Sequence, residues 1–140
     1  FYDILKTNKC SYFLRVCADS PFLDFKLIDK LYSKIKNNKA DIFTNIFPRT
    51  FPSGQSVEII KTDTFFKTYR SIKSLSDKEH VTRFFYKNSK NFIILNYSDQ
   101  KDYSNFSLSL DHKIDLIKYK KIIDFTKDKY FEWKKILQLI

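Results

Sequence analysis

The sequence predicts an α/β protein with a layered sheet, and two observations support that prediction. Short aromatic and β-branched segments alternate along the chain with segments whose apolar residues recur at helical spacing. The chain has 140 residues, of which 43% are apolar, enough for one domain with a sizeable core. Such alternation is typical of a sheet flanked by helices. We therefore expect a single domain over residues 1–140.

Each element follows from local signals. The strands are expected at residues 11–17, 41–46, 56–60, 91–97 and 106–110. The helices are expected at residues 1–8, 24–36, 62–71, 76–87, 114–126 and 130–139. Asp24 and Thr62 are expected to cap their helices, and Ser76 to Glu79 reads as a capping box. The apolar face of the second helix is expected to hold Phe25, Ile28, Leu31, Tyr32 and Ile35.

Composition excludes several classes of protein. No apolar run approaches the roughly 20 residues of a membrane-spanning helix, so no membrane partner is expected. The net charge of +10 is spread along the chain as lysine, which favours a solvated surface over a nucleic-acid interface. Cys10 and Cys17 lack zinc-site spacing, and a reducing cytoplasm fits them best. The chain has no Met and begins inside a helix, so we expect the later part of a longer protein.

Two aspartates follow predicted strands, where open α/β sheets bind ligands. Asp19 comes after the strand that ends at Cys17, and Asp111 comes after the strand that ends at Leu110. Mg²⁺ prefers oxygen ligands and commonly takes one or two carboxylates together with substrate phosphates. The alternative is structural, because Asp often starts a turn or caps a helix.

Four motifs, in order, resemble those of cytidylyltransferases. The first is the stretch from Phe13 to Asp24, which contains Arg15 and Ala18-Asp19-Ser20-Pro21. The others are Asn45 with Pro48-Arg49-Thr50-Phe51-Pro52, Gly54 and Val57-Glu58; then Glu79-His80-Val81-Thr82; then Leu110-Asp111 with Asp115-Leu116. The pattern is similar to the spore-coat polysaccharide branch related to CMP-KDO and CMP-sialate synthetases. Ser53, Ser56 and His112-Lys113-Ile114 depart from it.

The resemblance implies a three-layer, nucleotide-diphospho-sugar transferase-like mixed sheet flanked by helices and truncated at the N-terminus. It implies transfer of CMP from CTP to an acidic keto sugar, with release of pyrophosphate, for surface polysaccharide synthesis. Mg²⁺ would be held by Asp19 and Asp111. The family's N-terminal triphosphate-binding segment has no counterpart here, so the isolated chain is expected to be inactive.

By the same resemblance, Arg49, Glu58 and His80 lie near the sugar. Arg49 would bind a sugar carboxylate, Glu58 would bond sugar hydroxyls, and His80 would orient substrate or move a proton. Each has an ordinary alternative: Arg49 could be a surface charge, Glu58 an edge residue of the sheet, and His80 a structural histidine. Arg15, inside an apolar strand, could contact substrate or form a buried pair with an acidic neighbour.

Other interpretations remain open. A glycosyltransferase-like domain that uses a nucleotide sugar would also place acids at strand ends, although its usual Asp-x-Asp pair is missing. A basic binding module would need a contiguous lysine face.

The aromatic residues, including Phe84, Phe85 and Tyr86, fit core packing better than base stacking. The apolar stripe on the last helix, with Trp133, could close the core or meet a second subunit in a homodimer.

Overall fold

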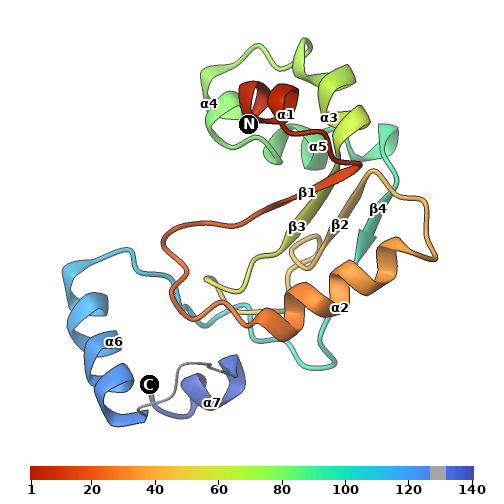
Figure 1. Cartoon of the computed structure of the whole chain (residues 1–140). Helices are drawn as coiled ribbons and strands as arrows, with labels where there is room; N and C mark the ends of the chain where they lie inside the picture. The colour runs from red at the N-terminus through yellow and green to blue at the C-terminus, as the bar shows by residue number, and fades with distance from the viewer. Residues whose placement is uncertain (127–131) are drawn as a thin grey trace.

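The computed structural model describes residues 1–126 and 132–140. Its centre is a mixed four-stranded sheet with the order β1-β3-β2-β4 (Figure 1). The strands are β1 (Tyr12–Arg15), β2 (Ile42–Thr44), β3 (Glu58–Lys61) and β4 (Ile94–Asn96). Strand β3 runs antiparallel to β1 and β2, whereas β2 and β4 are parallel. The expected α/β fold with a mixed sheet is confirmed.

Helices cover both faces of this sheet. They are α1 (Tyr2–Thr7), α2 (Phe25–Ile35), α3 (Thr62–Tyr69), α4 (Leu75–Glu79), α5 (Arg83–Lys87), α6 (Lys113–Thr126) and α7 (Trp133–Leu137), with a 3₁₀ turn η1 (Ser89–Asn91). Figure 1 shows α2 along one side of the sheet. Helices α1, α3, α4 and α5 are grouped together away from α2. Among the described residues, no helix combines the length and apolar character needed to cross a bilayer.

Alternate residues of the central strands pack into two separate hydrophobic cores, one on each face of the sheet. Phe43 and Ile59 belong to the core that includes Leu27 and Leu31 of α2. Their neighbours Ile42 and Ile60 belong to the core on the other face, with residues of α1, α3 and α5. Successive side chains of a strand point to opposite faces, so a strand covered on both sides must be apolar throughout. This requirement explains the continuous apolar segments in the sequence.

Helix α2 begins as expected but buries a different face. The Asp24 carboxylate accepts a hydrogen bond from the backbone N–H of Lys26 at 2.9 Å, which confirms it as the N-cap. The buried residues are Leu27 and Leu31, whereas Phe25 and Tyr32 are 47% and 60% exposed. The predicted face was therefore wrong in part, because the sheet meets the helix along its leucines.

The predicted helix over residues 76–87 is instead two short helices. Ser74, not Ser76, caps α4, since its hydroxyl accepts the N–H of Asp77 at 3.0 Å. The helix then ends at Glu79, and α5 begins only at Arg83. The cap thus lies two residues earlier than predicted, and the Ser76 hydroxyl instead accepts a hydrogen bond from the Arg83 guanidinium, so the capping-box assignment was wrong. Thr62 is likewise the first residue of α3 and not its cap.

Residues 106–110 form no strand, which corrects another prediction. Ser107 makes only an isolated bridge with Ser53, and the Leu108 N–H donates to the Ser53 carbonyl at 2.8 Å. The segment pairs with a loop and not with the sheet, so its strand-like composition serves loop packing. At the C-terminus, α7 lies within the predicted 130–139 helix, whose residues 130 and 131 fall outside the described residues.

The loop between β2 and β3 is held by buried amide side chains. The Asn45 side chain donates to the Gln55 carbonyl and accepts the N–H of Val57. The Gln55 side chain donates to the Phe22 carbonyl and accepts the N–H of Asp24. Both amides are fully buried. They tie the loop to the start of α2, which fixes the backbone where the resemblance placed Arg49 and Glu58.

Gly54 is required by this loop. Its φ is +81°, a conformation that L side chains rarely adopt, and an added Cβ would lie 2.6 Å from the Leu108 carbonyl carbon. We expect Gly54→Ala to lower the free energy of unfolding by about 2 kcal/mol or more, through backbone strain and this contact. Denaturant unfolding measures the loss. Ser53→Ala is the matched control, and an equal effect of the two substitutions would contradict the explanation.

Candidate functional site

A fully buried carboxylate lies at the centre of the candidate site. Glu58 begins β3 and has no exposed surface. The register of β1 and β3 places Arg15 directly opposite it, and the Arg15 guanidinium donates to Glu58 Oε2 at 2.6 Å. Burial by itself lowers the pKa of Arg15, but the hydrogen bond and charge of Glu58 raise it above its ordinary value. The pair that the sequence left open for Arg15 is therefore present.

The second oxygen of Glu58 is taken by Tyr86 of α5. The Tyr86 hydroxyl donates to Glu58 Oε1 at 2.6 Å and lies 3.1 Å from the hydroxyl oxygen of Thr44. Burial and the negative charge of Glu58 raise the pKa of Tyr86 well above its ordinary value. The phenol therefore stays protonated and acts as a donor to the carboxylate.

Arg49 lies in the same neighbourhood. Its guanidinium donates to the Ser56 hydroxyl at 3.0 Å and to the Pro52 carbonyl at 3.3 Å. Both acceptors are neutral, and within the described chain no carboxylate lies within ion-pairing distance of Arg49. Burial lowers the pKa of Arg49, while the charge of Glu58 partly offsets that effect. We call Arg15, Arg49, Glu58 and Tyr86 the two-arginine cluster.

The loop that carries Arg49 is fixed at its start. The Asn96 side chain accepts the N–H of Phe47 at 3.0 Å and donates to the Pro48 carbonyl at 2.9 Å. A cis peptide bond joins Phe47 to Pro48. The Phe47 ring stacks on the Tyr86 ring, with centroids 4.9 Å apart and planes at 22°. Phe47 keeps 39% of its surface exposed beside the cluster.

Asp19 and Asp111 come from distant parts of the sequence that lie side by side. The N–H of Leu110 donates to the Asp19 carbonyl at 2.7 Å. Both aspartates are exposed. The Ser20 hydroxyl donates to the Asp19 carboxylate at 2.9 Å, and the Asp115 carboxylate accepts the backbone N–H of Asp111. The structure therefore brings together the two segments that were predicted to hold a metal.

These carboxylates suit a magnesium ion that is shared with a substrate. The described residues contain no group of three or more His, Cys, Asp or Glu side chains that could hold a metal by themselves. Mg²⁺ binds through one or two carboxylates plus substrate phosphates, so exposed carboxylates on two adjacent segments have the chemistry for that use. The magnesium site itself stays a prediction.

His80 lies apart from these contacts. It follows the last residue of α4, and its side chain is exposed. Its backbone N–H donates to the Ser76 carbonyl, and its carbonyl accepts the N–H of Arg83. In the described part of the chain, no hydrogen bond joins the His80 side chain to the two-arginine cluster. Its expected role in catalysis or sugar binding stays a prediction.

Sequence reasoning missed Tyr86, Thr44 and Asn96. Tyr86 was assigned to core packing together with its aromatic neighbours, and its ring does pack against Phe47. Its hydroxyl, however, serves Glu58. A glutamate inside an apolar strand needs more than one hydrogen-bond donor, and that need was the available signal.

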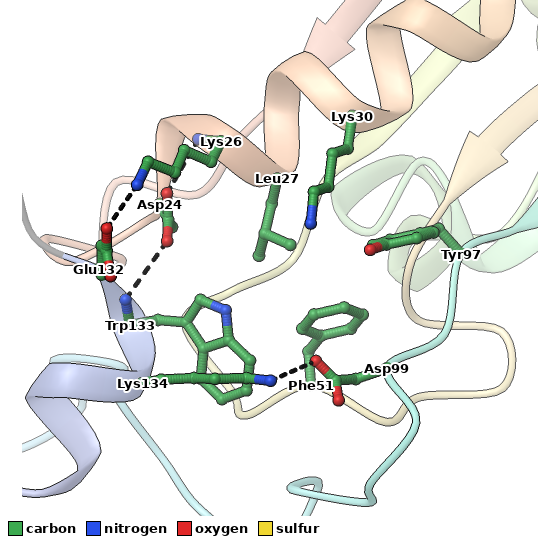
Figure 2. A pocket seen from close by; sticks show the side chains of 10 residues that line it. All are labelled: Asp24, Lys26, Leu27, Lys30, Phe51, Tyr97, Asp99, Glu132, Trp133 and Lys134. Atoms are coloured by element: carbon green, nitrogen blue, oxygen red, sulfur yellow. Dashed lines mark hydrogen bonds and ion pairs between the residues drawn. The ribbon is translucent and has the colours of Figure 1, made fainter.

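A separate cavity of about 200 Å³ lies near the start of α2 (Figure 2). Its ten lining residues are Asp24, Lys26, Leu27, Lys30, Phe51, Tyr97, Asp99, Glu132, Trp133 and Lys134. Ion pairs join Lys26 to Glu132 and, at 3.0 Å, Lys134 to Asp99. The buried Asp24 carboxylate also accepts the N–H of Trp133 at 3.4 Å. These contacts attach α7 to the start of α2 and to the segment that follows β4. None of the predicted site residues lines the cavity.

Comparison with known proteins identifies a family model and a solved structure that match this chain along almost its whole length. Residues 1–139 match the family model described as Cytidylyltransferase. The chain belongs to the cytidylyltransferase family. Its structure is similar to that of a cytidylyltransferase from Leptospira borgpetersenii serovar Hardjo-bovis, with a TM-score of 0.88 and 26% identity. That match covers 99% of this chain and 59% of the other.

A curated relative is an uncharacterized protein of Methanocaldococcus jannaschii. It is 27% identical over 103 residues, which are 74% of this chain and 41% of that protein. The chain thus spans less than two thirds of the length of either relative. Family membership confirms the cytidylyltransferase resemblance and the nucleotidyltransferase-like fold, whereas the spore-coat branch and the expected truncation stay predictions.

The raised pKa of Tyr86 gives a testable dependence of stability on alkaline pH. The folded state keeps this proton above pH 10.0, where the unfolded state loses it, so the stabilisation is present below that pH and falls as pH rises. We expect the native protein to lose about 1.4 kcal/mol per pH unit more than Tyr86→Phe between pH 10 and 11.5.

Denaturant unfolding at a series of pH values measures this slope. Between pH 7 and 9 the difference between the two proteins should be constant, which provides the internal control. If the free energies of unfolding of the two proteins changed in parallel with pH across the whole range, the assignment of a protonated, buried Tyr86 would be contradicted.

Proposed function

We propose that the protein transfers CMP from CTP to an acidic sugar and releases pyrophosphate. The observation that carries the proposal is the two-arginine cluster, in which a buried glutamate holds one arginine, while the other, among the residues that the structure describes, has only neutral hydrogen-bond acceptors. A half-buried guanidinium with no acid partner of its own favours an anionic ligand. Membership of the cytidylyltransferase family supports CTP as the nucleotide.

Arg49 suits the carboxylate of an acidic sugar. Its planar guanidinium can bind a carboxylate through two parallel hydrogen bonds, which fix orientation as well as position. Arg15 lies across the same cluster, with 20% of its side chain exposed. The site would discriminate against neutral sugars, because an uncharged group leaves the Arg49 guanidinium without a counter-charge, whereas Arg15 keeps Glu58.

Glu58 supports this site through Arg15. Both of its carboxylate oxygens already accept short hydrogen bonds, from Arg15 and from Tyr86. Its complete burial favours a positioning role over direct contact with sugar hydroxyls. The family resemblance also suggests two other roles. Glu58 would bind sugar hydroxyls directly, and His80 would orient the substrate or transfer a proton.

Asp19 and Asp111 are the residues that we propose to hold Mg²⁺. The ion would supply charge cancellation on the phosphates of CTP. The adjacent placement of their segments supports this role. Asp115 accepts the backbone N–H groups of Asp111 and His112, which orders the start of α6 beside the proposed site.

The chemistry needs positioning more than covalent help. A sugar hydroxyl oxygen attacks the α-phosphorus of CTP, the bond from that phosphorus to the bridging oxygen breaks, and pyrophosphate leaves. The hydroxyl proton passes to a base or to solvent. By holding the sugar acid at a fixed place, the arginines would direct the hydroxyl along the line of attack. The product is an activated acidic sugar, the class of donor that surface polysaccharide synthesis consumes, and we propose the cytoplasm as its place.

Arg49→Ala in the full-length protein tests this function. Pyrophosphate release is measured with CTP, Mg²⁺ and a panel of acidic and neutral sugars. We expect the variant to raise the KM for the acidic sugar roughly 10- to 100-fold and to leave the KM for CTP within about twofold, because the lost contact is to the carboxylate.

The exposed Arg70→Ala serves as the charge-matched control and should behave like the parent. Absence of CTP-dependent pyrophosphate release with every acidic sugar would overturn the proposal. A preference for neutral sugars would also contradict it.

A further inference from the structure

The Tyr86 side chain contacts Glu58, the partner of Arg15, and also Phe47, which lies two residues before Arg49. We infer that Tyr86 is a positioning residue that sets the orientation of both Arg15 and Arg49 toward the acid of the substrate. This inference rests on the proposed function and deepens it, since it assigns sugar-acid selectivity to a residue of α5. Tyr86 acts through the arginines and does not itself touch the substrate.

The first connection runs through the hydroxyl. Tyr86 donates to one oxygen of Glu58 at 2.6 Å, and Arg15 donates to the other at 2.6 Å. The carboxylate has no exposed surface, so water does not replace a lost partner. With the hydroxyl absent, the carboxylate would turn toward its remaining donor, and the Arg15 guanidinium would turn with it.

The second connection runs through the ring. The Tyr86 ring stacks on Phe47, two residues before Arg49 in the loop. Asn96 fixes the backbone between Phe47 and Pro48 through two hydrogen bonds. The loop is thus fixed both from β4, through Asn96, and from α5, through Tyr86. Movement of the Tyr86 ring would therefore be transmitted to Arg49.

Tyrosine meets both needs at this position. Phenylalanine would keep the stack on Phe47 but would leave one oxygen of a buried carboxylate without its donor. A smaller polar residue could reach neither Glu58 nor Phe47. The Thr44 hydroxyl lies 3.1 Å from the phenol oxygen and can donate to it, because the single Tyr86 proton is directed to Glu58.

The test uses the full-length protein and the variant Tyr86→Phe. We expect the KM for the acidic sugar to rise roughly 5- to 50-fold, while kcat and the KM for CTP stay within about twofold. With a sugar analogue whose carboxylate is replaced by a carboxamide, the parent and the variant should not differ. A merely structural role would shift all of these constants together.

Two further variants sharpen the result. Phe47→Leu removes the stack but not the hydroxyl, and should raise the same KM with less effect on CTP. Tyr97→Phe removes a phenol that stacks on Phe51 outside the cluster, and should match the parent. If Tyr86→Phe fails to fold, Phe47→Leu alone decides, since its side chain is 39% exposed.

Direct binding separates this inference from the proposed function. Titration calorimetry with N-acetylneuraminate, a 2-keto sugar acid, requires no turnover. Weaker binding to Tyr86→Phe supports the inference even if no pyrophosphate is released, in which case the proposed transfer reaction alone fails. Equal affinities for the parent and the variant, an equal rise in the KM for CTP, or no binding to the parent would overturn the inference.

Discussion

The arrangement of the candidate site depends on the burial of one carboxylate. An ion removed from water is stable only when every oxygen finds a donor, and Glu58 finds two, Arg15 on the neighbouring strand and Tyr86 on a helix. The β1–β3 register brings the first donor, and the packing of α5 against the sheet brings the second. The requirement to satisfy Glu58 thus fixes the relative positions of β1, β3 and α5.

The loop from β2 to β3 links this centre to the rest of the molecule. Its backbone groups at Gln55 and Val57 bond to the buried side chain of Asn45, and the Gln55 side chain bonds to backbone groups at the start of α2. Gly54 lets the loop approach the segment around Leu108, which continues to Asp111 beside Asp19. The arginines and the proposed metal ligands therefore share one continuous scaffold, although their residues are far apart in sequence.

Local signals predicted most of the fold and part of the site. Apolar strands, the Asp24 cap and the proline-containing loop are visible in the sequence because each rests on neighbouring residues. The strand predicted at residues 106–110 is absent because that segment pairs with a loop. The cap predicted at Ser76 is absent because Ser74, two residues earlier, caps α4. Tyr86 was missed as a site residue because its role depends on a contact with Glu58, 28 positions away, which no local pattern records.

A structure of the full-length protein with an acidic sugar and CTP bound would show whether Arg49 holds the sugar carboxylate. We expect the sugar carboxylate within hydrogen-bonding distance of the Arg49 guanidinium, with Arg15 still paired to Glu58 and the CTP phosphates facing Asp19 and Asp111. A sugar bound with its carboxylate directed away from both arginines would show that the two-arginine cluster does not recognise the substrate acid.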